Sequence, residues 1–304
     1  MSRRLSLVLI ACAVSLAAAF YAVRTARQRP IGAYVIPLGE VAKVSWWAWP
    51  RVIETPTGVP GGAQIKVTEG STVAVVFLDG TVQRVAGPAR ALIPAAPPKP
   101  VAVLGAPEAE LKASAKEASA AFPAHHGLRV TSPVGVTRYL NPVISWVAKA
   151  GVLYDVALVD PADEAAPPRL LRGARPPVSL EALEGPQAPR LPADRIFAVL
   201  VRESVDREVV GINRFLTRED ATLGAPPVAA AERVLEAVDA MKTAPARTGD
   251  AWLALQGLPP AWAASPLVAR LRIVIDGQLG LGEAAPAGKS DTRRVPPSLT
   301  ATRG

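Results

Sequence analysis

The residues of this chain best suited to acid–base or metal chemistry are its two histidines, His125 and His126. A hydrolase uses histidine as the base that activates a nucleophile, and a zinc site uses it as a ligand. Adjacent histidines point in different directions, and no nearby cysteine or acidic pair completes a set of metal ligands. We therefore predict a solvated loop at this position and no metal site.

Other signatures of catalysis are missing from the sequence. It contains no Gly-x-Ser-x-Gly motif, phosphate-binding loop, dinucleotide fingerprint or His-Glu-x-x-His pattern. The carboxylate pairs Asp163-Glu164 and Glu219-Asp220 lie in polar stretches, where we expect them to behave as solvated charges. The sequence thus predicts a protein that is not an enzyme and that uses no cofactor.

Three tryptophans, Trp46, Trp47 and Trp49, form the densest aromatic cluster. An exposed cluster would be a binding surface for a ligand or a membrane, because tryptophan combines an apolar body with a polar edge. On a strand, alternate tryptophans would instead fill a small core, since alternate residues face the same side. We favour the core for Trp46 and Trp49, which leaves Trp47 as the exposed member.

The net charge of +8 is concentrated at the two ends of the chain. A nucleic-acid-binding protein needs basic residues and stacking aromatics on one folded face. The segment between the two ends is neutral, so we expect no nucleic-acid partner. Near the N-terminus, a charge of +5 comes from Arg3, Arg4, Arg24, Arg27 and Arg29. Near the C-terminus, a charge of +3 comes from Lys289, Arg293, Arg294 and Arg303, less the negative charge of Asp291.

An uncharged apolar stretch spans residues 5–23, between arginine-bearing flanks. As a helix it would be about 28 Å long, which matches the hydrocarbon core of a bilayer. We expect residues 1–30 to form a single-pass anchor in a bacterial inner membrane, with the bulk of the chain in the periplasm. Two alternatives stay open: a signal peptide cleaved after Ala17–Ala19, and a lipoprotein, because residues 9–12 end in Cys12 like a lipobox.

Residues 31–94 alternate between β-branched runs and turn signals, which predicts a small β-meander. Two strands, Gln64–Thr68 and Ser71–Leu78, are expected to form a hairpin at Glu69-Gly70. Asp79-Gly80 then predicts a second hairpin into Thr81–Val85, because both residue types accept positive φ.

This segment resembles the FecR-type periplasmic domain. The resemblance lies in Leu38-Gly39-Glu40-Val41, Gly70-Ser71-Thr72-Val73, Phe77-Leu78-Asp79-Gly80-Thr81 and Gly87-Pro88. It implies a β-rich domain outside the inner membrane, and some members relay signals to a sigma factor. Those regulators carry a cytosolic domain before the membrane helix, whereas only Met1–Arg4 precede it here. Transmembrane signalling is therefore kept as the alternative function.

Residues 95–127 have the composition of a Pro/Ala-rich linker, and within them Glu108–Ala121 is expected to be a spacer helix with little to bury. Residues 128–220 predict a β-sandwich. Its Trp146 and Tyr154 are similar to the aromatic core residues of fibronectin type III and immunoglobulin-like modules. The expected strands are Leu128–Thr131, Val143–Val147, Val152–Val159, Arg195–Arg202 and Glu208–Phe215.

Residues 221–283 predict a small helical bundle that packs on its own apolar stripe. Helices are expected over Pro226–Lys242, from Asp250, and after Ser265 as N-cap, with residues 284–304 disordered. The fold class is thus mainly β with a helical C-terminus. We expect a membrane-anchored, non-catalytic envelope protein that acts as a scaffold or binding module for an envelope protein or a cell-wall polymer.

Overall fold

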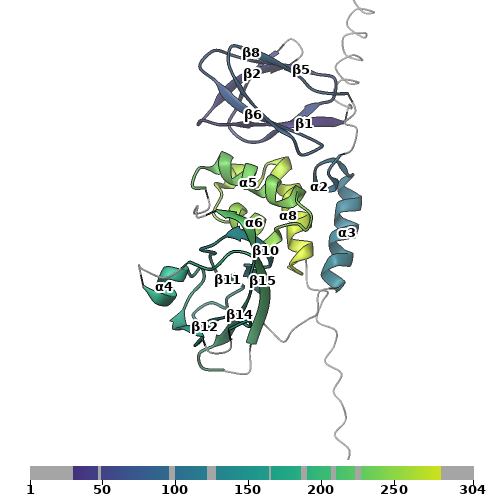
Figure 1. Ribbon diagram of the computed structural model, residues 1–304. Coiled ribbons are helices and arrows are strands. Elements are labelled where there is room, and N and C mark those ends of the chain that lie inside the picture. Colours follow the sequence, from purple (N-terminus) through teal and green to yellow (C-terminus); the bar gives the residue numbers. More distant parts are fainter. Residues whose placement is uncertain are drawn as a thin grey trace, which may run out of the picture.

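The computed structural model describes residues 30–46, 49–95, 100–121, 128–163, 166–185, 190–206, 210–222 and 227–281. The chain is mainly β, and a layer of helices lies between two β modules (Figure 1). None of the helices in the described ranges is long and apolar enough to cross a membrane. The anchor predicted over residues 5–23 lies outside those ranges.

The first module consists of two facing antiparallel sheets of four strands each. One has the order β4-β1-β6-β7 and the other β3-β2-β5-β8. The strands are β1 Ile31–Pro37, β2 Ala42–Trp46, β3 Trp49–Ile53, β4 Thr57–Pro60, β5 Gln64–Val67, β6 Thr72–Phe77, β7 Val82–Ala86 and β8 Ala89–Leu92.

The two predicted hairpins of this module have opposite outcomes. The hairpin at Asp79-Gly80 is confirmed, because β6 pairs with β7 and the Gly80 N–H donates to the Phe77 carbonyl at 2.9 Å. The hairpin at Glu69-Gly70 is wrong, because β5 and β6 belong to different sheets. Both strands direct alternate apolar residues into one shared core, and two facing sheets bury that core on both sides.

Strands β1 and β6 are buried on both faces. Their alternate residues face either the core between the two sheets, as Val35 and Val75 do, or the helices, as Ile36 and Val76 do. Such strands are expected to be apolar at nearly every position. The covering by helices explains the unbroken apolar runs of β1 and β6.

The middle layer combines C-terminal helices with two helices from the predicted linker. Helix α8 begins at Pro266 after Ser265, as predicted, although the Ser265 side chain makes no capping bond. The apolar residues of α5, α6 and α8 pack on one another and also on β1 and β6. The helices are α2 Ala102–Gly105, α3 Glu108–Ala121, α5 Ala230–Lys242, α6 Thr248–Leu255, α7 Pro260–Ala263 and α8 Pro266–Gln278.

Helix α3 has the predicted bounds but a different role. It packs along α8, and a Cβ atom placed on Gly277 would lie only 2.5 Å from the Ala115 Cα. Leu111 is buried in the described structure, and Arg270 of α8 donates to the carbonyls of Val103 and Ala106. The small side chains that suggested a bare spacer permit this close approach of two helices. The segment is therefore part of the helical layer.

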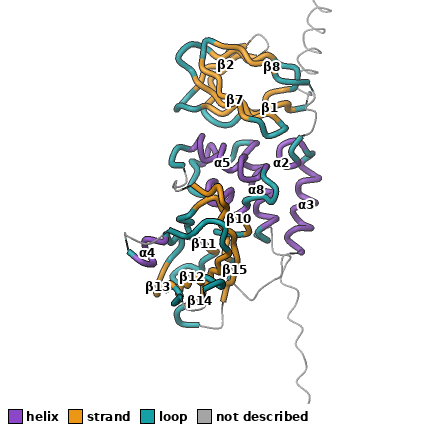
Figure 2. The backbone as a smooth tube through the Cα atoms, in the orientation of Figure 1, coloured by secondary structure: helices purple, strands orange, loops and turns teal. Residues whose placement is uncertain are grey.

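The second module consists of a five-stranded sheet and a two-stranded sheet (Figure 2). The orders are β10-β15-β14-β12-β13 and β11-β9, and β10 runs parallel to β15. Trp146 and Tyr154 are both buried and pack edge to face at 5.5 Å between ring centroids. The elements are β9 Val130–Ser132, β10 Gly135–Tyr139, β11 Ser145–Trp146, β12 Tyr154–Val159, β13 Arg169–Ala174, α4 Leu180–Glu184, β14 Ile196–Glu203 and β15 Val210–Thr222.

Candidate functional site

The tryptophan cluster does not form one exposed platform. Trp46 is buried in the core of the first module, and the guanidinium of Arg51 lies 4.5 Å from the centroid of its ring. Such a cation–π contact is favourable at a partly exposed edge. Trp49 lies opposite Trp46 in the β2–β3 pair, and Trp47 lies outside the described residues. Trp46 therefore fills the core, which is the second of the two interpretations.

Of the residues considered for catalysis, only Asp163, Glu219 and Asp220 lie in the part of the chain that the structure describes. His125, His126 and Glu164 lie outside the described ranges, and Glu219 and Asp220 lie in strand β15. The Asp163 carboxylate accepts a hydrogen bond from the Ala166 N–H at 3.2 Å, which is a local turn contact. Within the described ranges, no three histidine, cysteine or acidic residues are grouped so that they could hold a metal ion.

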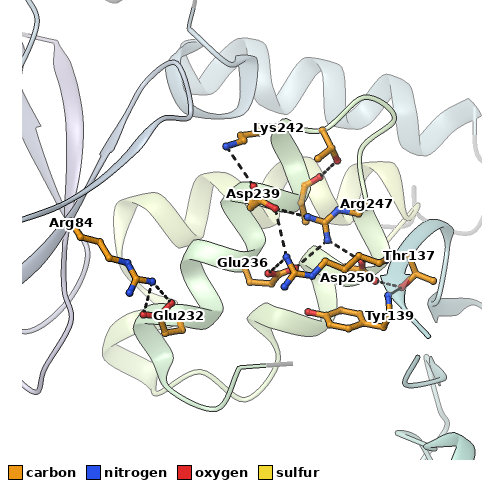
Figure 3. A network of polar contacts seen from close by, with 12 residues as sticks. Arg84, Thr137, Tyr139, Glu232, Glu236, Asp239, Lys242, Arg247 and Asp250 are labelled. Carbon is orange, nitrogen blue, oxygen red and sulfur yellow. Dashed lines mark hydrogen bonds and ion pairs between the residues drawn. The ribbon is translucent and has the colours of Figure 1, made fainter. Parts of the chain in front are cut away.

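A charge network that the sequence did not predict lies inside the helical layer (Figure 3). Arg247 is buried just before α6, and its guanidinium contacts three carboxylates. The N–O distances are 3.2 Å to Glu236, 2.6 Å to Asp239 and 3.2 Å to Asp250. Glu236 and Asp239 are three residues apart on α5, so both side chains lie on one face of that helix.

The same network reaches strand β10 of the second module. The Asp250 carboxylate accepts hydrogen bonds from the Thr137 hydroxyl at 2.8 Å and from the Arg138 N–H at 3.1 Å. The Arg138 guanidinium forms an ion pair with Glu236 at 3.0 Å. Burial raises the pKa of Asp250, while Thr137, Arg138 and Arg247 act against that rise. Burial and the nearby Glu236 charge also raise the pKa of Tyr139 far above its ordinary value.

This arrangement is suited to joining modules. Each carboxylate of the network faces a cation or a hydrogen-bond donor of the protein itself. Gly249 fits against the loop before β10, where an added Cβ would lie 2.8 Å from the Val134 nitrogen. On the other side, one terminal guanidinium nitrogen (Nη2) of Arg84 on β7 donates to both carboxylate oxygens of Glu232 on α5, at 2.9 and 3.0 Å (Figure 3). The helical layer is thus bonded to both β modules.

The sheet β3-β2-β5-β8 lies at the end of the molecule remote from the helices (Figure 1). We call its outer surface the distal face. The four strands contain no aspartate or glutamate. Three of the outward residues of these strands are basic, namely Lys43, Lys66 and Arg90. The other outward residues are Ser45, Pro50, Val52, Gln64 and Leu92.

Two of these cations are directly opposed. Lys66 of β5 pairs in register with Arg90 of β8, and both side chains are exposed. Directly opposed residues have Cβ atoms about 5 Å apart, and like charges at that spacing destabilise a sheet. Leu92, with 69% of its surface exposed, lies two residues from Arg90 on the same face. The distal face therefore combines concentrated positive charge with exposed apolar surface.

This face is not apparent in the composition of the sequence, because the total charge between the two ends of the chain is zero. The alternation of polar and apolar residues in β5 and β8 marks Lys66 and Arg90 as outward. Only the strand order makes them neighbours, because β6 and β7 lie between them in the sequence but belong to the other sheet. No protein-family model matches this chain, and a search of curated proteins finds no match either.

Proposed function

We propose that this chain is a membrane-anchored, non-catalytic envelope protein whose distal face binds an anionic polymer of the cell envelope. The observation that carries this proposal is the register pair of Lys66 and Arg90 on strands without any acidic residue. A bound phosphate or carboxylate relieves the repulsion between the two cations through charge-assisted hydrogen bonds. The energetic cost of this arrangement in the free protein is then offset in the complex.

The frame behind the distal face supports a scaffold role. The first module is covered by helices on its other sheet and is bonded to them through Arg84 and Glu232. The buried network around Arg247 then joins those helices to the second module. A rigid frame keeps two β modules at a fixed separation, which lets one module bind the polymer while the other contacts a protein.

The proposed location follows from the sequence. Residues 5–23 are long and apolar enough to anchor the chain, and residues 31–94 resemble the FecR-type periplasmic domain. The first module follows the anchor directly at Pro30 and Ile31. In this arrangement the distal face lies on the same side of the membrane as the polymers of the envelope.

Binding of the full-length chain to model polymers tests the function. The chain, held in non-ionic detergent, is titrated with polyphosphate and with polygalacturonate, and with neutral dextran for comparison. We expect both polyanions to bind with an affinity that falls as salt is added, because binding releases counterions. In the double variant Lys66→Glu/Arg90→Glu, affinity should fall at least about tenfold, which is ~1.4 kcal/mol.

A charge-matched variant makes this comparison specific. Lys112→Glu/Lys116→Glu changes the net charge by the same amount on the exposed side of α3. We expect it to retain most of the affinity, because it leaves the distal face unchanged. An equal loss in both double variants would mean that the polymer responds only to total charge, and the proposal would then be wrong.

A further inference from the structure

Two cations of the distal face have no partner in the described part of the chain. Arg84, on the opposite sheet of the same module, is also exposed, but its charge is matched by Glu232. Lys66 and Arg90 form no side-chain hydrogen bond or ion pair with any residue that the structure describes. We call these two residues the cation pair. Its two positive charges face solvent.

The acidic residues nearest to the distal face lie at one end of its sheet. Lys43 lies nearest to that end, whereas the cation pair lies farther along the strands. At about 3.3 Å per residue, the glutamate that follows β5 is up to about 10 Å from Lys66. The positive charge of the face is therefore least compensated at the cation pair. The flanking acidic residues are Glu40, Glu54 and Glu69.

A third hydrogen-bond donor extends the cation pair into a row across three strands. Ser45 of β2 is in register with Lys66 of β5, and Lys66 is in register with Arg90 of β8. Ser45 lies between two buried residues of β2, so its side chain faces outward with the cations. Its hydroxyl forms no hydrogen bond with the described residues. Neighbouring strands are about 4.8 Å apart, so the row presents three donors over about 10 Å.

The number of oxygens and the charge of an anion decide how well it suits this row. A carboxylate has two oxygens and one charge, and the planar guanidinium of an arginine engages both oxygens at once. A phosphomonoester has three terminal oxygens and a charge of about −1.5 to −2 at neutral pH. With two of its oxygens on Arg90, the third remains for Lys66, and the second charge matches the second cation.

We propose that the distal face recognises phosphomonoester groups of an envelope polymer in preference to carboxylates. This inference rests on the proposed function and names the anionic group that the face selects. The phosphoryl group lies over β5, which has β2 on one side and β8 on the other. Arg90 and Lys66 neutralise the dianion, and the Ser45 hydroxyl donates to an oxygen on the side of β2.

Two dextrans of equal length and equal substitution test this preference. One carries phosphomonoester groups and the other carboxymethyl groups, and each is titrated into the full-length chain in non-ionic detergent at pH 5 and pH 8. The second pKa of a phosphomonoester is about 6, whereas carboxylates are mostly ionised at pH 5. We expect affinity for dextran phosphate to rise about tenfold between the two pH values, and to exceed that for carboxymethyl dextran at pH 8. Titration of the protein itself would affect both polymers alike.

Three variants separate the donors of the row. Arg90→Lys keeps the charge but loses the planar fork, so the preference for dextran phosphate at pH 8 should largely disappear. Ser45→Ala should weaken binding of dextran phosphate about threefold and leave carymethyl dextran binding unchanged. The control Thr72→Ala removes an exposed side chain of the other sheet and should change neither affinity.

The possible results distinguish this inference from the proposed function. Equal affinities and equal pH profiles for the two polymers would overturn the phosphate preference and leave polyanion binding intact. Failure of both polymers to bind would overturn both proposals. Inorganic phosphate, added as a competitor, should displace dextran phosphate only at a molar excess of about 100-fold over polymer phosphate, because a polymer presents many groups near one face. Displacement at equal phosphate concentration would indicate a small free anion as the ligand and contradict recognition of a polymer.

Discussion

The Thr137 hydroxyl donates a 2.8 Å hydrogen bond to the Asp250 carboxylate, across a separation of 113 residues in the sequence. Both residues are buried, Thr137 on β10 and Asp250 on α6. The bond belongs to the network that also contains Arg247 and Glu236. The second module is therefore joined to the helical layer through buried polar groups, whose loss is more costly than that of surface contacts.

Removing one anion from this network should destabilise the protein. In Asp250→Ala we expect the free energy of unfolding to fall by about 3 kcal/mol, because the buried Arg247 charge loses a partner. Urea unfolding of the two chains measures the difference. Asp163→Ala, at an exposed turn, should change the value by less than about 0.5 kcal/mol. Similar small effects of both substitutions would show that the network does not hold the modules together.

The pH dependence of stability should report on Asp155. Burial raises the pKa of this carboxyl. The Ser204 hydroxyl, the Gly173 N–H and Arg202 together lower the pKa by more than burial raises it, so the net shift is downward from 3.8. A lowered folded-state pKa contributes stability above the unfolded value of 3.8, and that stability is lost as the pH falls through the folded value. Urea unfolding below pH 3.8 should give a shallower decline for Asp155→Asn than for the wild type. Equal slopes would contradict this assignment.

The contact between α3 and α8 should tolerate no added methyl group. In Gly277→Ala the new Cβ would lie 2.5 Å from the Ala115 Cα, so the helices must separate. We expect a loss of about 1–3 kcal/mol, as in other overpacked cores, measured by thermal or urea unfolding. The control is Gly39→Ala, where the nearest atom is the Val41 carbonyl oxygen at 4.0 Å. A neutral Gly277→Ala would mean that α3 is only loosely placed, as the spacer hypothesis expected.

Stability and polymer binding should change in opposite directions at Lys66. Lys66→Glu converts a like-charge register pair with Arg90 into an opposite-charge pair, which should add about 0.2–1 kcal/mol to the free energy of unfolding. The same variant should bind polyanions more weakly. Unfolding and titration of one preparation check both effects. A variant that loses both stability and binding would indicate a structural role for Lys66.

Local signals predicted several of the individual elements. The Asp79-Gly80 turn, helix α3 and the start of α8 at Pro266 occur where the sequence placed them, because turn chemistry and capping act over a few residues. The Glu69-Gly70 turn has the same local character, yet it joins strands of different sheets. Its outcome depends on the shared core, which is made by residues distant in the sequence.

The candidate sites depend even more on such distant contacts. Alternation in β5 and β8 already indicates that Lys66 and Arg90 face outward, but their pairing requires the strand order. Arg247 resembles any helix-flanking arginine in the sequence, and only the packing of α5, α6 and β10 surrounds it with carboxylates. The burial of Trp46, in contrast, could be predicted from local sequence, because strand alternation alone favoured a core position for it.

The side of the membrane on which the distal face lies is the most direct test of the central proposal. Leu92 is 69% exposed on that face, so Leu92→Cys offers a thiol there. Intact cells with a permeabilised outer membrane are treated with a membrane-impermeant maleimide, and the wild type, with Cys12 alone, gives the background. We predict strong labelling of Leu92→Cys in intact cells. Labelling that appears only after the inner membrane is lysed would place the face in the cytoplasm and contradict the proposed envelope function.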